Sequence, residues 1–478
     1  MSVLSGCKPE RVFHFFEEIC QIPHPSYHEE KISAYLVDFA KAHGLEYYQD
    51  DLYNVIMIKE ASAGYENAAP IILQGHMDMV AEQDSDCTKD MMTEGLDLEV
   101  VDGFLTAKGT TLGGDDGIAV AMALALLEDE DLKHPRLEVI ITVSEEVGME
   151  GAAGIDVSML KGRKLLNLDS EEEGTFLAGC AGGCRMDVTY SYAKETVSGN
   201  LFALDVKECE GGHSGTEINK GRANATFVIA RLLAQGLKAG EICLVEFVGG
   251  KKDNAIPRAT SVKFVADKAV IDEIKKEAEE IKSEFAVTDP AMVIALTDMG
   301  QSTLDGVGAK DSRRMVQLLS SMPNGVQAMS QDIEGLVETS LNLGVLNLTE
   351  DVFTFSSALR SSVDSAKEAL MRKVEMVAEA FGCQVEIRGQ YPAWEYNRES
   401  EFRDTMVQIY KDITGVEPKV ETLHAGVECG LLGAKLPGLD AVSIGPDMCD
   451  VHTPKEKLSI ASTERTYDLV RRVIESAK

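Results

Sequence analysis

Short apolar runs alternate with longer amphipathic stretches through the first third of the chain. Four runs are short and rich in branched side chains, as buried strands are; they cover residues 52–58, 70–75, 137–143 and 164–168. Helical apolar spacing marks three further stretches, at residues 10–20, 31–44 and 115–130. Strands that alternate with helices predict an α/β domain in which a mixed, largely parallel sheet has helices on both faces.

One of these helices carries signals at both ends. Ser26 and Glu29 have the spacing of a capping box ahead of residues 31–44. Gly44 follows the last apolar position and is expected to end the helix.

The pattern changes near residue 185. Strand-like runs and long helical stretches follow without the earlier alternation, which predicts an α+β unit. After QYPAW at residues 390–394, helix and strand signals resume up to the end of the chain. With 478 residues, the chain is too long for one ordinary core. We therefore expect a discontinuous catalytic domain of residues 1–184 and 391–478, and an inserted lid domain of residues 185–390.

Ionisable side chains stand just beyond the ends of the predicted strands. Four strands lead into His76 and Asp78, into Glu145 and Glu146, into Asp169, and through a short loop toward His452, while Asp115 and Asp116 begin the helix after TTLGG. In open α/β sheets, ligands bind beyond the carboxyl ends of the strands. These acids and imidazoles are therefore expected to meet at one edge of the sheet.

So many carboxylates need cations among them, because like charges disfavour each other's ionised forms. The expected ligands are two histidines and three carboxylates, a set that suits zinc and also accepts manganese or cobalt; they are His76, Asp115, Glu146, Asp169 and His452. Two divalent ions bring four positive charges, and one bridging hydroxide then makes the site neutral. Asp115 is the candidate for the carboxylate that bridges both ions.

Two acids remain for other work. Asp78 is expected to lie behind His76 and accept its second N–H, because residues i and i+2 of an extended segment point to the same side. Glu145 is the candidate general base that takes a proton from water and passes it to the leaving amine. Each motif alone is weak evidence, since a lone His-x-Asp is usually surface chemistry, and only their combination at strand ends is specific.

The composition narrows the class of protein. The formal net charge is 46 − 80 = −34, which argues against binding to nucleic acid or to anionic membranes. Residues 1–25 show no secretory signal, and no apolar run of about 18 residues could span a bilayer. The ten cysteines are dispersed, so reduced thiols and a cytoplasmic location are expected.

The ordered motifs resemble a known family. GHMDMV, GTTLGGDDGIAVA, TVSEEVGMEGA, NLDSEEEG and DVHTPKEKLSI closely resemble the aminoacyl-histidine dipeptidases, or cytosol non-specific dipeptidases. These belong to the aminoacylase/carboxypeptidase superfamily of two-zinc hydrolases. The similarity runs nearly end to end and includes GGHSGTEIN, NAIPR, SSALRSSVDS and HAGVECG.

The resemblance implies two Zn²⁺ per subunit, the five ligands named above, and Asp78 and Glu145 as the catalytic pair. It also implies a small peptide as substrate, a lid domain that mediates a homodimer, and four substrate-binding residues: His213, Asn254, Arg360 and Gly426. His213 matches a residue that polarises the scissile carbonyl, and Arg360 suits an α-carboxylate. From the residues alone, a loop histidine between glycines such as His213 is more often structural, and Arg360 could be a solvated charge that closes a strand.

The chain departs from the family at one position. Relatives commonly carry Asn after the bridging aspartate, where this chain has Asp116. The extra acid either starts the helix favourably or tunes the choice of metal, and the sequence does not separate these two interpretations.

The sequence thus predicts a metal-dependent hydrolase of dipeptides with broad specificity, including Xaa-His and β-alanyl-histidine substrates. A tripeptidase, a carboxypeptidase or an N-acyl amino acid hydrolase would use the same metals with a different lid. An acidic metal-binding scaffold would need the ligands but neither Glu145 nor a substrate grip.

Overall fold

The computed structural model describes residues 3–478, and the chain folds into two compact units. Unit 1 consists of residues 1–180, 396–422 and 427–478, and unit 2 of residues 181–395 and 423–426. The boundaries expected at 184/185 and 390/391 thus lie a few residues from those of the structure. The return of residues 423–426 to unit 2 has no counterpart in the sequence prediction.

The main sheet of unit 1 is mixed. Its strand order is β1 (Glu46–Gln49), β2 (Val55–Lys59), β6 (Leu137–Thr142), β3 (Ile71–His76), β7 (Lys164–Asn167), β21 (Asp440–Ser443), β8 (Thr175–Cys180) and β20 (Lys419–Leu423). The four central strands, β6, β3, β7 and β21, pair in parallel, whereas β1, β2 and β8 pair antiparallel. Every residue of β3 and β6 is buried, which accounts for their continuous apolar sequences.

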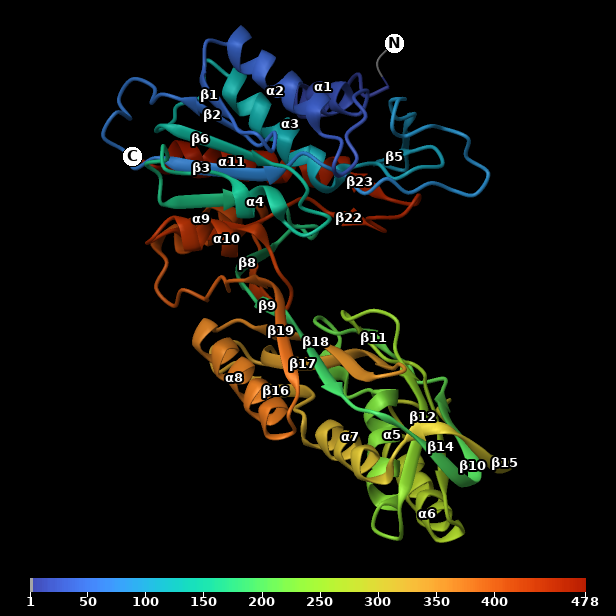
Figure 1. The fold of residues 1–478 in the computed structure, drawn as a ribbon. Coiled ribbons are helices and arrows are strands. Elements are labelled where there is room, and N and C mark those ends of the chain that lie inside the picture. The colour runs from blue at the N-terminus through green and yellow to red at the C-terminus, as the bar shows by residue number, and fades with distance from the viewer. Residues whose placement is uncertain (1–2) are drawn as a thin grey trace. The chain divides into compact units, whose positions relative to one another are not determined.

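Helices cover both faces of this sheet (Figure 1), which confirms the predicted fold class. One face carries α1 (Glu10–Ile19), α2 (Glu30–Ala42), α3 (Gly114–Glu128), α9 (Glu401–Thr414) and α11 (Ile460–Ser476), whose buried side chains share one core with Leu73, Leu166 and Val442 of the sheet. The other face carries α10 (Glu428–Lys435), where Glu428 contacts Gln74 and Thr142. The short helix α4 (Glu150–Gly154) contacts α10. A second, small sheet has the order β22 (Met448–Cys449), β23 (Lys457–Ser459), β5 (Phe104–Ala107) and β4 (Leu98–Val101).

Unit 2 is built on a separate antiparallel sheet with its own hydrophobic core. The strand order is β15 (Val293–Val307), β10 (Lys194–Lys207), β14 (Thr260–Ala266), β12 (Ile242–Gly249), β17 (Val337–Leu348), β18 (Val352–Ser361), β9 (Gly182–Ser191) and β19 (Gln384–Tyr391), and β16 (Gly325–Met329) also pairs with β17. The helices are α5 (Ala225–Gly236), α6 (Lys268–Glu284), α7 (Ala309–Ser321) and α8 (Asp364–Ala380). A two-stranded ribbon joins β11 (Gly212–His213) to β13 (Ala255–Ile256), and a single 3₁₀ turn covers Ile218–Lys220.

The expected capping box is wrong. Helix α2 begins after Glu29, and no side chain caps its first turn. The Glu29 carboxylate instead accepts hydrogen bonds from the backbone N–H and the hydroxyl of Ser144, at 3.0 and 2.8 Å. Glu29 therefore supports the loop after β6, a tertiary contact that competes with local capping. Gly44 does follow the end of α2, with φ of +65°.

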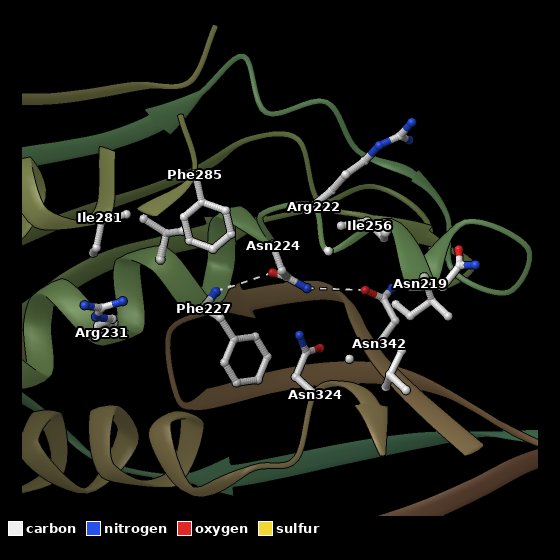
Figure 2. A pocket seen from close by; sticks show the side chains of 15 residues that line it. Asn219, Arg222, Asn224, Phe227, Arg231, Ile256, Ile281, Phe285, Asn324 and Asn342 are labelled. Carbon is white, nitrogen blue, oxygen red and sulfur yellow. Dashed lines mark hydrogen bonds between the residues drawn. The ribbon is translucent and has the colours of Figure 1, made fainter. Parts of the chain in front are cut away.

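A cavity of about 380 Å³ in unit 2 is lined by four asparagines, two arginines and several apolar side chains (Figure 2). Its buried amides already have structural partners. Asn224 caps α5 through the N–H groups of Thr226 and Phe227, and it donates to Asn342 Oδ1 at 3.3 Å. Among the described residues, no helix is long and apolar enough to cross a membrane.

Candidate metal centre

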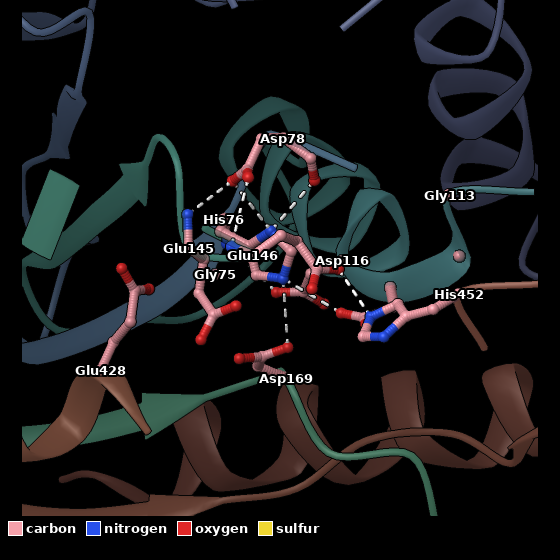
Figure 3. Close-up of polar contacts among 12 residues, drawn as sticks. Gly75, His76, Asp78, Gly113, Asp116, Glu145, Glu146, Asp169, Glu428 and His452 are labelled. Carbon is pink, nitrogen blue, oxygen red and sulfur yellow. Dashed lines mark hydrogen bonds and ion pairs between the residues drawn. The ribbon is translucent and has the colours of Figure 1, made fainter. Parts of the chain in front are cut away.

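The predicted ligands of unit 1 converge at the carboxyl end of the parallel strands (Figure 3). His76 is the last residue of β3, Asp169 follows β7, and Glu146 follows β6. His452 lies in the loop between β22 and β23, and Asp115 lies in the first turn of α3. Four separate segments and one helix start thus bring these side chains together, as the sequence predicted.

Asp115 divides the site into two halves. Its Oδ1 lies 3.0 Å from Nε2 of His76, and its Oδ2 lies 3.1 Å from Nε2 of His452. His76 Nε2 is also 3.4 Å from an Asp169 oxygen, and His452 Nε2 is 2.8 Å from a Glu146 oxygen. Each half therefore contains one imidazole, one further carboxylate and one oxygen of Asp115.

The start of α3 gives Asp115 its position. Asp115 and Asp116 have non-helical backbone angles, and regular helix follows them. Gly75 in β3 lets this turn approach, because a Cβ there would come within 2.4 Å of the Asp116 carboxylate and 2.8 Å of Ala119. Strand β3 and helix α3 thus pack at a distance that only glycine allows at position 75.

Asp78 lies behind His76, on the side of its Nδ1 atom. Nδ1 of His76 is 3.0 Å from the backbone oxygen of Asp78 and 3.3 Å from its carboxylate. The same carboxylate accepts hydrogen bonds from the backbone N–H groups of Glu145 and Glu146 and from the Ser26 hydroxyl. Asp78 therefore connects the loop after β3 to the loop after β6.

Buried negative charge dominates the electrostatics of the site. Burial raises the pKa of Asp169 to about 7 and the pKa of Glu145 well above its ordinary value. Hydrogen bonds that His452 donates to the carboxylates of Asp115 and Glu146 raise the pKa of His452 to about 11. The imidazoles thus attract protons strongly because carboxylates crowd them, and a metal cation would satisfy the same carboxylates.

Asp116 is fully buried among these groups. One of its oxygens accepts the backbone N–H of His76 at 3.2 Å, and the other has no hydrogen-bond partner among the described residues. Burial, followed by the charge of Asp169, raises the pKa of Asp116 well above its ordinary value. Asp116 is therefore not a solvated residue at a helix start.

The donor set fits divalent ions. Ligand atoms of His76, Asp116 and Asp169 lie within 4.8 Å of one another, as do those of His76, Asp115 and Glu146. Imidazole and carboxylate donors in this proportion suit zinc, manganese or cobalt. The unpartnered oxygen of Asp116 adds a further acceptor that the sequence interpretation had not used as a ligand.

Unit 2 holds a cluster of basic side chains, made of His213, Arg360 and His424. A Cβ placed at Gly215 would come within 3.0 Å of the His213 ring and 3.2 Å of Arg360 Nε, so these groups surround one glycine. Nε of Arg360 and Nδ1 of His424 are buried without a hydrogen-bond partner in the described part of the chain. None of the three forms an ion pair with a carboxylate there; Arg360 donates to the hydroxyl of Tyr391, and His424 contacts Ser340 at 2.8 Å.

The other two predicted substrate-binding residues also lie in unit 2. Asn254 lines a cavity of about 690 Å³ together with His213, and its backbone oxygen accepts the N–H of Ser214 at 2.9 Å. Gly426 follows His424 on the short segment of residues 423–426.

Three buried side chains near these sites escaped the sequence interpretation: His424, Glu428 and Glu456. Glu428, at the start of α10, accepts hydrogen bonds from Gln74 at 2.5 Å and Thr142 at 2.7 Å, and burial raises its pKa to about 8. All three lie inside motifs that carried the family resemblance, HAGVECG and DVHTPKEKLSI. That placement was the available signal, but only the fold shows that these polar side chains are buried.

The fold and the gathered ligands define a class of peptidase. Residues 72–476 match the model of peptidase family M20/M25/M40, and the chain belongs to that family. All five predicted metal ligands fall within the matched range.

Two relatives resemble the chain over almost its whole length. The cytosol non-specific dipeptidase of Escherichia coli is 36% identical over 480 aligned positions, which cover 99% of each chain. The structure of aminoacylhistidine dipeptidase from Vibrio alginolyticus is also 36% identical, with a TM-score of 0.93 and coverage of 99% of this chain and 98% of that one. An aminopeptidase PepT from Bacillus cereus, 17% identical with a TM-score of 0.57 over 98% of this chain and 99% of that one, shares the fold alone.

Proposed function

We propose that the protein is a metal-dependent dipeptidase of broad specificity, which accepts Xaa-His and β-alanyl-histidine dipeptides. The observation that carries this proposal is that the two oxygens of Asp115 face two different histidines, His76 and His452, each of which has a further carboxylate beside it. Glu145 lies next to this group (Figure 3). The two full-length relatives, both named as dipeptidases, support the substrate class.

Two ions would be held by the residues of the two halves. His76 and Asp169 would hold one, His452 and Glu146 the other, and Asp115 would serve both. Zn²⁺ is the proposed ion, with Mn²⁺ or Co²⁺ as substitutes, because histidine and carboxylate donors accept all three. Such a pair of ions, when bound, acidifies water and polarises a peptide carbonyl.

Glu145 would carry the proton in this reaction. It would take a proton from the attacking water and deliver it to the nitrogen of the leaving amine. Asp78 would hold the imidazole of His76 from behind and, through its bonds to residues 145 and 146, fix the loop that carries Glu145. A raised proton affinity at Glu145 suits a group that must accept a proton and then release it.

The basic cluster of unit 2 supports recognition of a free carboxyl terminus. Nε of Arg360 is buried and has no acidic partner among the described residues, an arrangement that is costly unless an anion binds there. Arg360 would pair with the α-carboxylate of the dipeptide, and His213 would polarise the scissile carbonyl. Asn254 and Gly426 would complete the substrate grip.

We also propose a cytoplasmic homodimer formed through unit 2. Strand β15 is at the edge of the sheet of unit 2 and pairs with β10 alone among the described strands. Val293 and Met299 on β15 are 47% and 48% exposed. A long edge strand with exposed apolar side chains is a surface that proteins usually cover.

Hydrolysis of a peptide panel before and after chelation tests the proposal. The panel contains Xaa-His dipeptides, β-alanyl-histidine, and analogues that are N-acetylated, C-amidated or extended by one residue. We expect the free dipeptides to be cleaved, the modified ones to be poor substrates, and chelation to abolish turnover until Zn²⁺, Mn²⁺ or Co²⁺ is restored. Activity that survives complete metal removal contradicts the proposal, and preference for the extended or acetylated analogues would instead indicate a tripeptidase or an N-acyl amino acid hydrolase.

A further inference from the structure

One buried carboxylate joins the two loops of unit 1 that carry Asp115 and His452. Glu456, in the loop before β23, is 2% exposed. Its two oxygens accept hydrogen bonds from four consecutive backbone N–H groups: Leu112 at 2.8 Å, Gly113 at 3.2 Å, Gly114 at 2.8 Å and Asp115 at 3.4 Å. The last of these N–H groups belongs to the residue proposed to serve both metal ions.

The turn before α3 is shaped to surround this carboxylate. Gly113 has φ of +67° and ψ of 31°, a left-handed conformation that glycine adopts readily. A Cβ at Gly114 would lie 3.2 Å from Oε1 of Glu456, so a side chain there would press on the carboxylate. Consecutive N–H groups that point inward form an anion-binding nest, and here a side chain of the same chain occupies it.

Glu456 is also fixed on the side of His452. Its backbone N–H donates to the Thr453 oxygen at 3.0 Å, and its own carbonyl oxygen accepts the Thr106 hydroxyl at 2.8 Å. The Thr453 hydroxyl donates to the Asp450 oxygen at 2.6 Å. The loop that carries His452 is therefore closed on itself and attached to the small sheet through Glu456.

We infer that Glu456 is a positioning residue for the metal centre, which holds the backbone of Asp115 at a fixed place relative to His452. The two oxygens of Asp115 can face two different histidines only if the loop that carries Asp115 and the loop that carries His452 keep their relative positions. Among residues 3–478, no basic side chain forms an ion pair with Glu456, so backbone N–H groups alone compensate its burial. The inference rests on the proposed two-ion site, and it adds a residue that does not itself bind metal.

Glu138 provides a matched control for a purely structural role. It is a fully buried glutamate of β6 whose carboxylate accepts the backbone N–H groups of Lys161 and Gly162 and the Arg136 side chain. Like Glu456, it closes a loop with backbone hydrogen bonds, but it makes no contact with a predicted ligand. Loss of such a bond network should lower stability without changing the metal site.

The test compares zinc binding by the full-length wild type, Glu456→Gln, Glu456→Asp and Glu138→Gln, using competition with a fluorescent chelator. We expect wild type and Glu138→Gln to bind two Zn²⁺ per chain with equal affinity. Glu456→Gln should bind its second Zn²⁺ roughly 10- to 100-fold more weakly, the range known for residues behind metal ligands. Glu456→Asp keeps the negative charge, so its affinity for the second Zn²⁺ should lie between those of wild type and Glu456→Gln. When chemistry limits the rate, kcat of Glu456→Gln should drop while KM changes less than about twofold.

Gly114→Ala supplies a second perturbation in case Glu456→Gln does not fold. It keeps the carboxylate and pushes on it, and should weaken the same second Zn²⁺. The inference is overturned if both perturbed proteins bind two Zn²⁺ as wild type does, or if Glu138→Gln loses the second ion equally. A wild type that binds fewer than two Zn²⁺ or cleaves no dipeptide contradicts the proposed function instead.

Discussion

At the scale of single residues, the site depends on carboxylates that do different work in similar surroundings. Asp115 is held between two imidazoles, and Asp78 accepts backbone N–H groups behind one of them. Among the described residues, no group donates a hydrogen bond to the carboxylate of Glu145. Burial raises the pKa of Glu145, whereas hydrogen bonds from His76 oppose burial and lower the pKa of Asp78. The surroundings of the two carboxylates therefore differ in the way expected if Glu145, as proposed, transfers a proton while Asp78 stays ionised.

Replacement of Glu145 by Gln tests this separation. The variant should keep its metals, because Glu145 is not a proposed ligand, and should lose roughly 100- to 10,000-fold in kcat, the usual contribution of a general base. Metal content and dipeptide turnover are measured on the same preparation. Glu150→Gln, at an exposed glutamate of the neighbouring helix α4, serves as the control and should retain full activity. Undiminished turnover of Glu145→Gln would remove Glu145 from its proposed role.

At the scale of elements, the parallel strands act as rigid supports for groups at their carboxyl ends. Strands β3, β6 and β7 are adjacent, so His76, the 145–146 loop and Asp169 leave the sheet side by side. Helix α3 completes the arrangement because Gly75 lets its first turn lie against β3. The spacing between β3 and α3 is thus part of the site.

Gly75→Ala should disturb this spacing. The added methyl would come within 2.4 Å of the Asp116 carboxylate and 2.8 Å of Ala119, so the strand or the helix must move. Overpacking of this kind costs roughly 1–3 kcal/mol, and we expect a lower melting temperature together with weaker metal binding. Gly433→Ala, in α10 with no atom within 4 Å of the new methyl, should leave stability equal or raise it by up to about 1 kcal/mol. Equal melting temperatures for Gly75→Ala and wild type would contradict this prediction, because they would show that β3 and α3 accommodate the added methyl without cost.

At the scale of the whole molecule, two units with separate cores divide the chemistry. Unit 1 contains the acidic metal centre, and unit 2 contains the basic cluster of His213, Arg360 and His424. In a chain with a net charge of −34, acidic side chains are abundant, yet the half-buried Arg360 forms no ion pair with a carboxylate among the described residues. That arrangement favours an anionic group supplied by the substrate.

Assembly is tested by mass in solution. Sedimentation equilibrium should give twice the 51.9 kDa of one chain if unit 2 forms a homodimer. Met299→Lys on the edge strand β15 should shift the mass toward the monomer, because a charge on an edge strand opposes pairing. Val287→Lys changes a side chain that is 91% exposed outside any strand and should leave the mass unchanged. A monomeric wild type would contradict the proposed dimer.

The sequence predicted features that depend on neighbouring residues better than features that depend on contacts between residues far apart in the chain. Periodicity located β2, β3, β6, β7 and α3 to within a few residues, because strand and helix patterns repeat over short distances. The capping box at Ser26 failed because Glu29 bonds instead to Ser144, far along the chain. The roles of the five ligands, of Glu145 and of the substrate-binding residues stay predictions, although the structure brings the five ligands together.

By itself, the sequence determined which residue types could bind metal and where along the strands they stand, because those features are local. Only the tertiary structure decided that each oxygen of Asp115 faces a different histidine, and that Glu456 reaches back to residues 112–115. Within KEKLS, Glu456 has the pattern of an ordinary surface charge. Its burial depends on a loop more than 300 residues away, and such a contact exists only after the chain has folded.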